Sequence, residues 1–166
     1  LNILSKLNIK IYKKDGFEAD DIIGTIVSSH MDGIQKYMYS GDKDLMQLVD
    51  KNTFLYSPGN TFKPTKIYGT QDVLNRYGIQ NNQFIDYLSL LGDTSDNIPG
   101  VKGVGAKTAS KLIVKYSDLE NIYNNIDDID NPRLKKLLSE NKENAFLSKR
   151  LITIDRNVEI KFKYNE

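Results

Sequence analysis

The chain has 166 residues, of which 39% are hydrophobic and 27% are charged, and it contains no cysteine. Its length suits one domain that buries about 70% of its unfolded surface, and its composition is that of an ordinary globular protein. The composition excludes disulfides, which weakly favours an intracellular location, and no apolar stretch is long enough to span a membrane.

The formal net charge is only +1, but the charges are unevenly distributed along the chain. Residues 15–50 contain eight acids and two lysines, whereas residues 98–116 contain four lysines and no acid. Residues 133–150 add six basic residues against two glutamates. This pattern suits a cation-loaded site flanked by phosphate-binding surface, although the last stretch alone is equally typical of a solvated helix face.

The first half of the chain predicts short strands alternating with helices. Apolar runs of strand length occur at 9–12, 34–39 and 53–56. Ile22, Ile23, Ile26 and Val27 have helical spacing, and a short helix is expected after the cap Ser40 or Asp42. A turn is expected at 57–61, and Pro64 makes residues 61–69 irregular or an edge strand.

The second half of the chain predicts mainly helices. They are expected at 70–78, 81–92, 105–116 and 118–125, with one or two more over 131–154, before strand-like alternation at 158–164. The opening residues 1–7 resemble the end of a helix. Strands first and helices later indicate an α/β sheet region joined to a helical region.

Seven carboxylates occur in three tight groups, which are the strongest signal of chemistry in the sequence. The groups are Glu18, Asp20 and Asp21 in "GFEADDIIG", Asp42 and Asp44 in "SGDKDL", and Asp93 and Asp96 in "LLGDTSDNIPG". The first two groups each follow a predicted strand, and strand ends of an open parallel sheet share one edge. We therefore expect these acids to converge although they are distant in sequence.

Clustered carboxylates need a compensating charge. Two of them about 4 Å apart repel by roughly 4 kcal/mol at an effective dielectric of 20. Oxygen ligands without histidine or cysteine select Mg²⁺ or Mn²⁺, and two such ions about 3.5–4 Å apart can clamp a phosphodiester displacement. Each group alone is also typical of a helix start, a cap or a turn, so the prediction depends on their joint occurrence.

A glycine-rich hairpin follows the third acidic group. In "NIPGVKGVGAKTASKLI", Ile98, Val101 and Val104 frame three glycines, and an ordinary turn between helices is the alternative. Glycines let a phosphate approach backbone N–H groups, and the next helix directs its N-terminus at that phosphate. The pattern indicates a helix–hairpin–helix element that binds nucleic-acid backbone without reading bases. Its candidate contacts are Gly100, Lys102, Gly103, Gly105, Lys107 and Thr108.

Together with "NKENAFLSKRLITI", these motifs resemble the 5′-nuclease domain of bacterial-type DNA polymerase I, in the flap endonuclease superfamily. The likeness runs from about residue 15 to residue 160. It implies a PIN-like or Rossmann-like, mostly parallel sheet (residues 1–78) followed by a helical region with the helix–hairpin–helix (residues 79–166), both within one nuclease domain.

The resemblance also implies an activity and a site. The activity is two-metal 5′→3′ exonuclease and flap endonuclease cleavage in DNA replication and repair, on DNA with a 5′ flap or nick or on an RNA–DNA primer. All seven carboxylates become catalytic metal ligands: Glu18, Asp20 and Asp21 at the cleavage-site ion, and the other four at its neighbour. A K⁺ ion at the hairpin, a fused or associated DNA polymerase and a location with the DNA are further implications.

One feature departs from the family pattern. The family's initial strand with its Asp, a further Asp and a basic helical arch have no counterpart in this sequence, so we expect a fragment of the nuclease domain with little activity of its own. Two alternatives remain open. One is a non-catalytic helix–hairpin–helix DNA-binding module; the other is a PIN-like ribonuclease, against which the hairpin counts.

Overall fold

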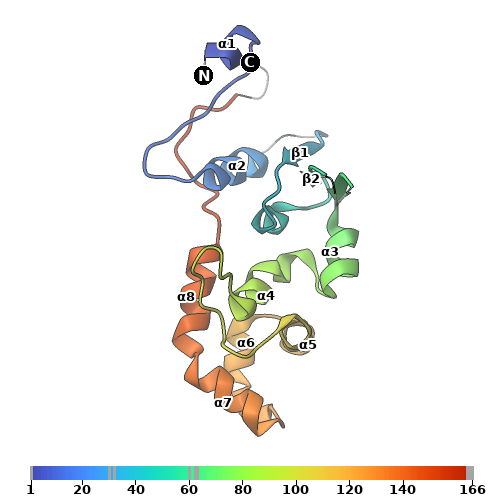
Figure 1. Ribbon diagram of the computed structural model, residues 1–166, viewed down its shortest axis with the longest axis vertical. Helices are drawn as coiled ribbons and strands as arrows, with labels where there is room; N and C mark the ends of the chain where they lie inside the picture. The colour runs from blue at the N-terminus through green and yellow to red at the C-terminus, as the bar shows by residue number, and fades with distance from the viewer. Residues whose placement is uncertain (1, 30, 32, 60, 62–63, 164–166) are drawn as a thin grey trace.

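The computed structural model describes residues 2–29, 31, 33–59, 61 and 64–163. A region of mixed helices and strands lies at one end of the molecule and a helical region at the other (Figure 1). The first contains α1 (Asn2–Lys6), α2 (Ala19–Ser28), β1 (Lys36–Tyr39), the 3-10 helix η1 (Asp44–Leu48), β2 (Thr53–Ser57), β3 (Lys66–Tyr68) and α3 (Thr70–Tyr77). The second contains η2 (Asn81–Gln83), α4 (Phe84–Leu91), α5 (Ala106–Tyr116), α6 (Leu119–Asn124), η3 (Ile126–Asp128), α7 (Pro132–Glu140) and α8 (Lys142–Ile152).

The sheet has the order β1-β2-β3 in the described part of the chain. β1 and β2 are parallel, with Met38 opposite Leu55, and β3 pairs antiparallel with β2. Met38 and Leu55 are buried on the inner face, whereas Tyr37 stacks on Phe54 on the other face at 5.2 Å between ring centroids. This alternation follows from the two-residue period of a strand.

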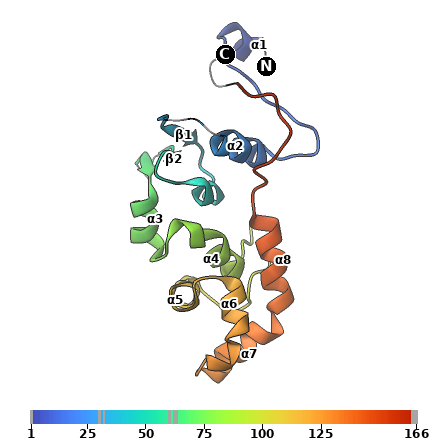
Figure 2. The ribbon, with the colours of Figure 1, turned by 180° about the vertical axis from the view of Figure 1, so that it is seen from behind.

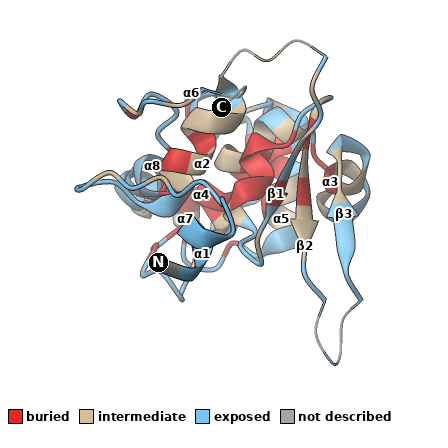
Figure 3. Cartoon of the chain, turned by 90° about the horizontal axis from the view of Figure 1, so that it is seen from above, coloured by how far each residue is buried: buried red, intermediate tan, exposed pale blue. Residues whose placement is uncertain are grey.

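Helix α4 is the centre of the helical region and packs against both α5 and α8. It is buried on nearly all sides because Phe84, Leu88 and Leu90 are apolar around its circumference. Figure 3 shows the buried residues gathered around α4, while α1 is exposed. The core continues into η1, so the two regions share one apolar interior.

The segment after α8 returns across the first region and binds to α2 through hydrogen bonds. The backbone N–H of Asp155 donates to the carboxylate of Asp21 at 2.8 Å, and that of Val158 donates to the Thr25 hydroxyl at 3.0 Å. Gly24 faces Ile154 so closely that an added Cβ would lie 2.6 Å from its side chain. The segment then runs beside residues 9–14 (Figures 1 and 2), where the Tyr12 and Phe162 rings meet edge-on.

Two predicted strands are wrong. Residues 9–12 are irregular because no neighbouring strand pairs with them, and Ile9 and Ile11 are exposed. Residues 158–163 are likewise irregular, and residue 164 lies outside the described residues. In both segments apolar alternation is present, but among the described residues neither segment pairs with a strand, and alternation alone does not make one.

The predicted α/β class is confirmed, as are the strands within 34–39 and 53–56 and the helices of the second half. Residues 131–154 form two helices that meet at Asn141, and residues 66–68 form the edge strand β3. The helix expected after Asp42 is a 3-10 helix, whose cap residue Lys43 makes no side-chain capping bond. The turn expected at 57–61 includes Asn60, which lies outside the described residues.

Candidate metal centre and nucleic-acid interface

Asp44, Asp93 and Asp96 come together at the boundary of the two regions. Each offers a carboxylate oxygen, and these oxygens all lie within 4.8 Å of one another. Asp44 begins η1 after the short loop that follows β1, whereas Asp93 and Asp96 lie in the loop that follows α4. Asp44 thus joins two acids that lie about 50 positions further along the chain in one cluster of three carboxylates.

The same cluster opens into a cleft of about 560 Å³ that contains further acids. Glu18 and Asp20 reach it from the N-terminus of α2, and Asp42 reaches it from the loop after β1. Because residues 9–12 are not a strand, the first group arrives from a loop and a helix start rather than from a sheet edge. The convergence of the acids is nevertheless present.

Electrostatic repulsion is concentrated on Asp44. Burial and the neighbouring carboxylate of Asp42, with smaller effects from Asp93 and Asp96, raise the pKa of Asp44 to about 6. One oxygen of Asp44, Oδ1, is buried without a hydrogen-bond partner among the described residues. Burial also raises the pKa of Asp20. Lys43 offsets part of this repulsion, but a half-buried carboxylate with a partnerless oxygen still favours a bound cation.

Lys43 contacts the cluster of three carboxylates, although it does not line the cleft, and the sequence reasoning did not single it out. Its ammonium group donates to the carboxylate of Asp93, and this contact lowers the pKa of Asp93. Burial lowers the pKa of Lys43, but the bond to Asp93 and the surrounding acids outweigh that effect and raise it. Its position between Asp42 and Asp44 was the available signal, because both of its neighbours in sequence are predicted ligands.

Asp21 differs from the other predicted ligands. Its carboxylate accepts from the N–H of Asp155 at 2.8 Å and from the N–H of Glu18 at 3.3 Å. It does not line the acidic cleft. The structure therefore gives Asp21 a capping and fastening position, while Glu18 and Asp20 of the same group face the cleft.

A divalent cation fits this donor set. The polar side chains that line the cleft are carboxylates, which Mg²⁺ and Mn²⁺ prefer to nitrogen or sulfur ligands. The partnerless oxygen of Asp44 and its raised pKa are the features that a cation would relieve. Asp44, Asp93 and Asp96 are the residues placed to hold one ion, and Glu18, Asp20 and Asp42 border the space beside it.

The hairpin is built onto the acidic loop through a close backbone crossing. Asp93 and Ile98 exchange both backbone hydrogen bonds, at 3.0 and 2.7 Å. Gly92 and Gly100 then meet so closely that a Cβ on Gly100 would lie 2.5 Å from the Gly92 nitrogen. Both glycines have positive φ, 74° and 57°, so the crossing needs glycine for conformation as well as for space.

The apolar residues of the hairpin, Ile98, Val101 and Val104, are buried as their spacing predicts. Lys102, Gly103, Gly105 and Lys107 are exposed, Thr108 is half-buried, and Gly105 caps α5. Gly100 is different, because it is buried and its N–H donates to the Ser148 hydroxyl at 2.9 Å. Its predicted contact with a phosphate does not agree with this geometry, since the amide is already used inside the protein.

A cleft lined by carboxylates and joined to a glycine hairpin, in a mixed α/β fold, is the class of site that takes a divalent cation. Comparison with known proteins gives the family. Residues 1–78 match the model of the 5′-3′ exonuclease N-terminal resolvase-like domain, and residues 79–166 match that of the 5′-3′ exonuclease C-terminal SAM fold. The chain belongs to the 5′-3′ exonuclease family.

Individual proteins agree with this assignment. DNA polymerase I of Caldicellulosiruptor bescii is 44% identical over 155 residues, which are 92% of this chain and 18% of that protein. The 5′-3′ exonuclease of Buchnera aphidicola is 41% identical over 170 residues, covering 97% of this chain and 58% of that protein. A bacteriophage T5 flap endonuclease solved with DNA and metal ions is 25% identical with a TM-score of 0.76, over 93% of this chain and 56% of that one.

The chain thus spans less than a fifth of the polymerase it matches and somewhat more than half of the exonuclease and of the T5 enzyme. No described helix is both long enough and apolar enough to traverse a lipid bilayer.

Proposed function

We propose that the protein hydrolyses phosphodiester bonds of DNA at 5′ ends and 5′ flaps, using two divalent ions, Mg²⁺ or Mn²⁺. The observation that carries this proposal is the cluster of Asp44, Asp93 and Asp96, whose oxygens lie within 4.8 Å of one another directly beside the hairpin. Family membership and the T5 enzyme solved with DNA and metal ions support it.

The acids divide into two sets in this proposal. Asp44, Asp93 and Asp96 hold one ion, and Glu18, Asp20 and Asp42, which border the same cleft, hold the other. When bound, such ions stabilise the charge of the attacking and leaving oxygens and lower the pKa of a water. Asp21 supports the second set indirectly, because its bonds to Glu18 and Asp155 fix the start of α2.

The hairpin holds the duplex beside the cleft. Lys102 and Lys107 supply charge, Thr108 supplies a hydroxyl, and the exposed backbone at Gly103 and Gly105 lets a phosphate approach the N-terminus of α5. A K⁺ ion held by the hairpin would add to this grip. Contacts of this kind read no bases, so we expect recognition of DNA structure rather than sequence.

The biological setting follows from the relatives. The matching proteins are named DNA polymerase I and 5′-3′ exonuclease, which supports a role in removing flaps, nicked ends or RNA–DNA primers during replication and repair, with a polymerase fused or associated. Residues 1–78 and 79–166 act together as one nuclease domain in this proposal, since the cleft takes Asp44 from the first part and Asp93 and Asp96 from the second.

The decisive experiment separates ion binding, DNA binding and cleavage. Asp44→Asn is compared with Asp127→Asn, a control at an exposed acid of the helical region whose ion pair within the described structure is with Lys135. Titration calorimetry with Mn²⁺ measures ion binding by the 166-residue chain, and cleavage of a labelled 5′-flap DNA is measured with the complete gene product that contains it.

We expect Asp44→Asn to lose ion binding at one site and to reduce cleavage by at least about a hundredfold, while DNA binding stays within about twofold. Asp127→Asn should behave like the parent. Normal cleavage by Asp44→Asn would contradict the metal assignment. DNA binding without ion binding or cleavage by the parent would instead support a non-catalytic DNA-binding module.

A further inference from the structure

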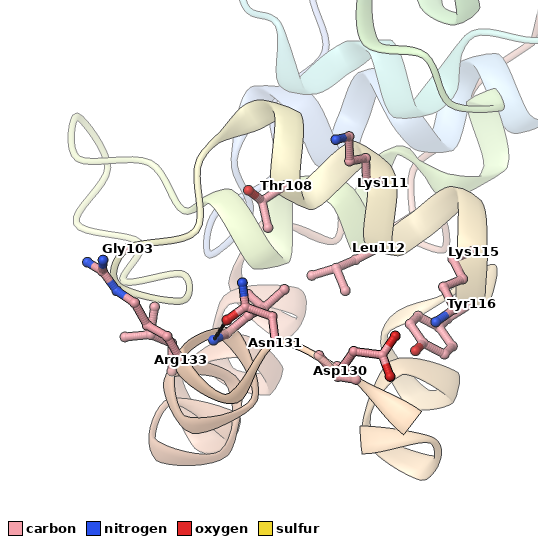
Figure 4. A pocket seen from close by; sticks show the side chains of 12 residues that line it. Gly103, Thr108, Lys111, Leu112, Lys115, Tyr116, Asp130, Asn131 and Arg133 are labelled. Carbon is pink, nitrogen blue, oxygen red and sulfur yellow. Dashed lines mark hydrogen bonds between the residues drawn. The ribbon is translucent and has the colours of Figure 1, made fainter. Parts of the chain in front are cut away.

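A cationic groove between α5 and α7 lies next to the hairpin and is separate from the acidic cleft. It encloses about 470 Å³, and Leu112, Leu134 and Leu137 form part of its apolar floor. Gly103 and Thr108 of the hairpin line one end (Figure 4). The two basic stretches of the sequence meet here, because Lys111 and Lys115 come from the first and Arg133 from the second.

The cations of this groove have few partners among the described residues, in contrast with the neighbouring cations of α7. Lys135 pairs with Asp127 at 2.6 Å, and Lys136 pairs with Glu140 at 3.7 Å. Arg133, on the same helix, forms no ion pair among those residues and is exposed. An arginine without an acid, set over an apolar floor, keeps its full charge and its fork of donors for an external anion.

The two ends of the groove are unequal. Figure 4 shows Arg133 at the end near Gly103, whereas Lys115 and Tyr116 lie at the other end with Asp130. Lys115 lies over the Tyr116 ring, with its Nζ 4.8 Å from the centroid. Asp130 is the acid of the lining, and Asn131 is occupied in capping α7 through Leu134 N–H. The end beside the hairpin is therefore the more positive one.

We propose that this groove takes one sugar–phosphate strand of the DNA duplex after it leaves the hairpin, with Arg133 binding a phosphate. The inference rests on the proposed function. The groove is far too small for a duplex and has the size of sites that hold a small ligand, about 300–1,000 Å³, so a single backbone strand can enter it. The apolar floor suits the carbon face of the sugars, and the shared wall at Gly103 and Thr108 makes the groove continuous with the hairpin.

The experiment measures fluorescence anisotropy without added divalent ion, on two 5′-flap DNAs. In the long-arm DNA the duplex extends past the protein's hairpin to the groove, and in the trimmed DNA the duplex ends at the hairpin. The variants are Arg133→Gln and Asp130→Asn, with Lys136→Gln as the charge-matched control on the same helix, since Lys136 does not line the groove. Arg133 and Asp130 are exposed, so these substitutions leave the core intact.

At about 50 mM salt, Arg133→Gln should weaken binding of the long-arm DNA by about three- to tenfold and reduce the salt slope by about one unit. Binding of the trimmed DNA should change less than twofold. Asp130→Asn should tighten long-arm binding, because it removes the repulsive charge of the groove. Lys136→Gln should have little effect on either DNA.

Equal losses of DNA affinity in Arg133→Gln and Lys136→Gln would show that only the overall positive charge of the surface attracts DNA, and would overturn the proposal. So would an unchanged DNA affinity in Arg133→Gln combined with lost binding of an acidic, leucine-containing peptide, which would make the groove a protein-docking surface. Failure of the proposed function is distinguishable, since it appears as absent cleavage by the parent while these binding differences persist.

Discussion

The side chain of Gln47 binds the backbone of Ile154, which lies 107 positions further along the chain. The Ile154 N–H donates to the Gln47 side-chain oxygen at 3.1 Å, and the Gln47 amide donates to the Ile152 carbonyl at 3.0 Å. Gln47 is buried in η1, the same short helix that begins with Asp44. This amide therefore fastens the segment after α8 to the side of the metal cleft.

We predict that Gln47→Ala lowers the free energy of unfolding by about 2–4 kcal/mol, because it leaves a buried N–H and a buried C=O unpaired. Urea denaturation measures the change. Gln71→Ala is the control, since Gln71 is exposed and bonds only Asn75 on its own helix. A loss in Gln47→Ala no greater than that in the control would show that the clamp contributes nothing.

Gly100→Ala should destabilise the protein by about 2–4 kcal/mol, because the position combines a positive φ with a backbone atom 2.5 Å from the new Cβ. Gly105→Ala is the matched control: its φ is −96° and nothing lies within 4 Å of an added Cβ. Thermal unfolding compares them. If Gly105→Ala were the more destabilising of the two, the close crossing of Gly92 and Gly100 would not be what holds the hairpin.

The acids Asp20 and Asp21 are adjacent, but we predict that their asparagine variants change different properties, ion binding in one case and stability in the other. Asp20→Asn should weaken Mn²⁺ binding with little change in stability, because Asp20 faces the cleft. Asp21→Asn should lower the free energy of unfolding by about 1–2 kcal/mol, because it weakens the bonds to Asp155 and Glu18. Calorimetry and urea denaturation on both variants give the comparison, and a reversed pattern would contradict these assignments.

Stability should also depend on pH through Asp72. Its carboxylate accepts from the Gly69 N–H at 3.0 Å and pairs with Lys66 at 3.0 Å, and these contacts lower the pKa of Asp72. A lowered pKa in the folded state gives stability that is present above the ordinary value of 3.8 and is lost as pH falls through the folded value.

Asp72→Asn should therefore cost about 0.5–1 kcal/mol at pH near 7 and less as the pH falls below about 4. Denaturation curves at several pH values measure the difference. Asp118→Asn is the comparison. Asp118 caps α6 by accepting from the Asn121 N–H, so this variant changes a cap but no ion pair of the kind that Asp72 makes with Lys66. If the cost of Asp72→Asn grew on acidification, the carboxylate of Asp72 would not be stabilised by its folded surroundings.

Much of the helical region could be predicted from the sequence, because helical spacing and end signals agree there. Thr70 to Gly78 is an example: the glycine at the end has φ 70° and terminates α3. The strands at 9–12 and 158–164 could not be predicted correctly, because a strand needs a partner and local alternation does not reveal whether one exists.

The candidate site likewise contains residues that the motifs placed correctly and residues whose position depends on distant contacts. The family resemblance placed Asp42, Asp44, Asp93 and Asp96 at one ion, and the structure brings oxygens of the last three within 4.8 Å of one another. The position of Asp21 depended on Asp155, 134 residues away, and the position of Gly100 depended on Ser148. Contacts of that range leave no local signal, so both residues received roles from their motifs that their surroundings do not match.

The bonds between Asp93 and Ile98 have a consequence for where the protein cuts. Four residues lie between Asp93 and Ile98, one of which is Asp96, and the paired backbone makes that short stretch stiff. In the proposed enzyme, the distance between the hairpin that binds the duplex and the cleft that cleaves it is therefore fixed. Inserting one residue between them would move the incision along the DNA instead of only slowing it.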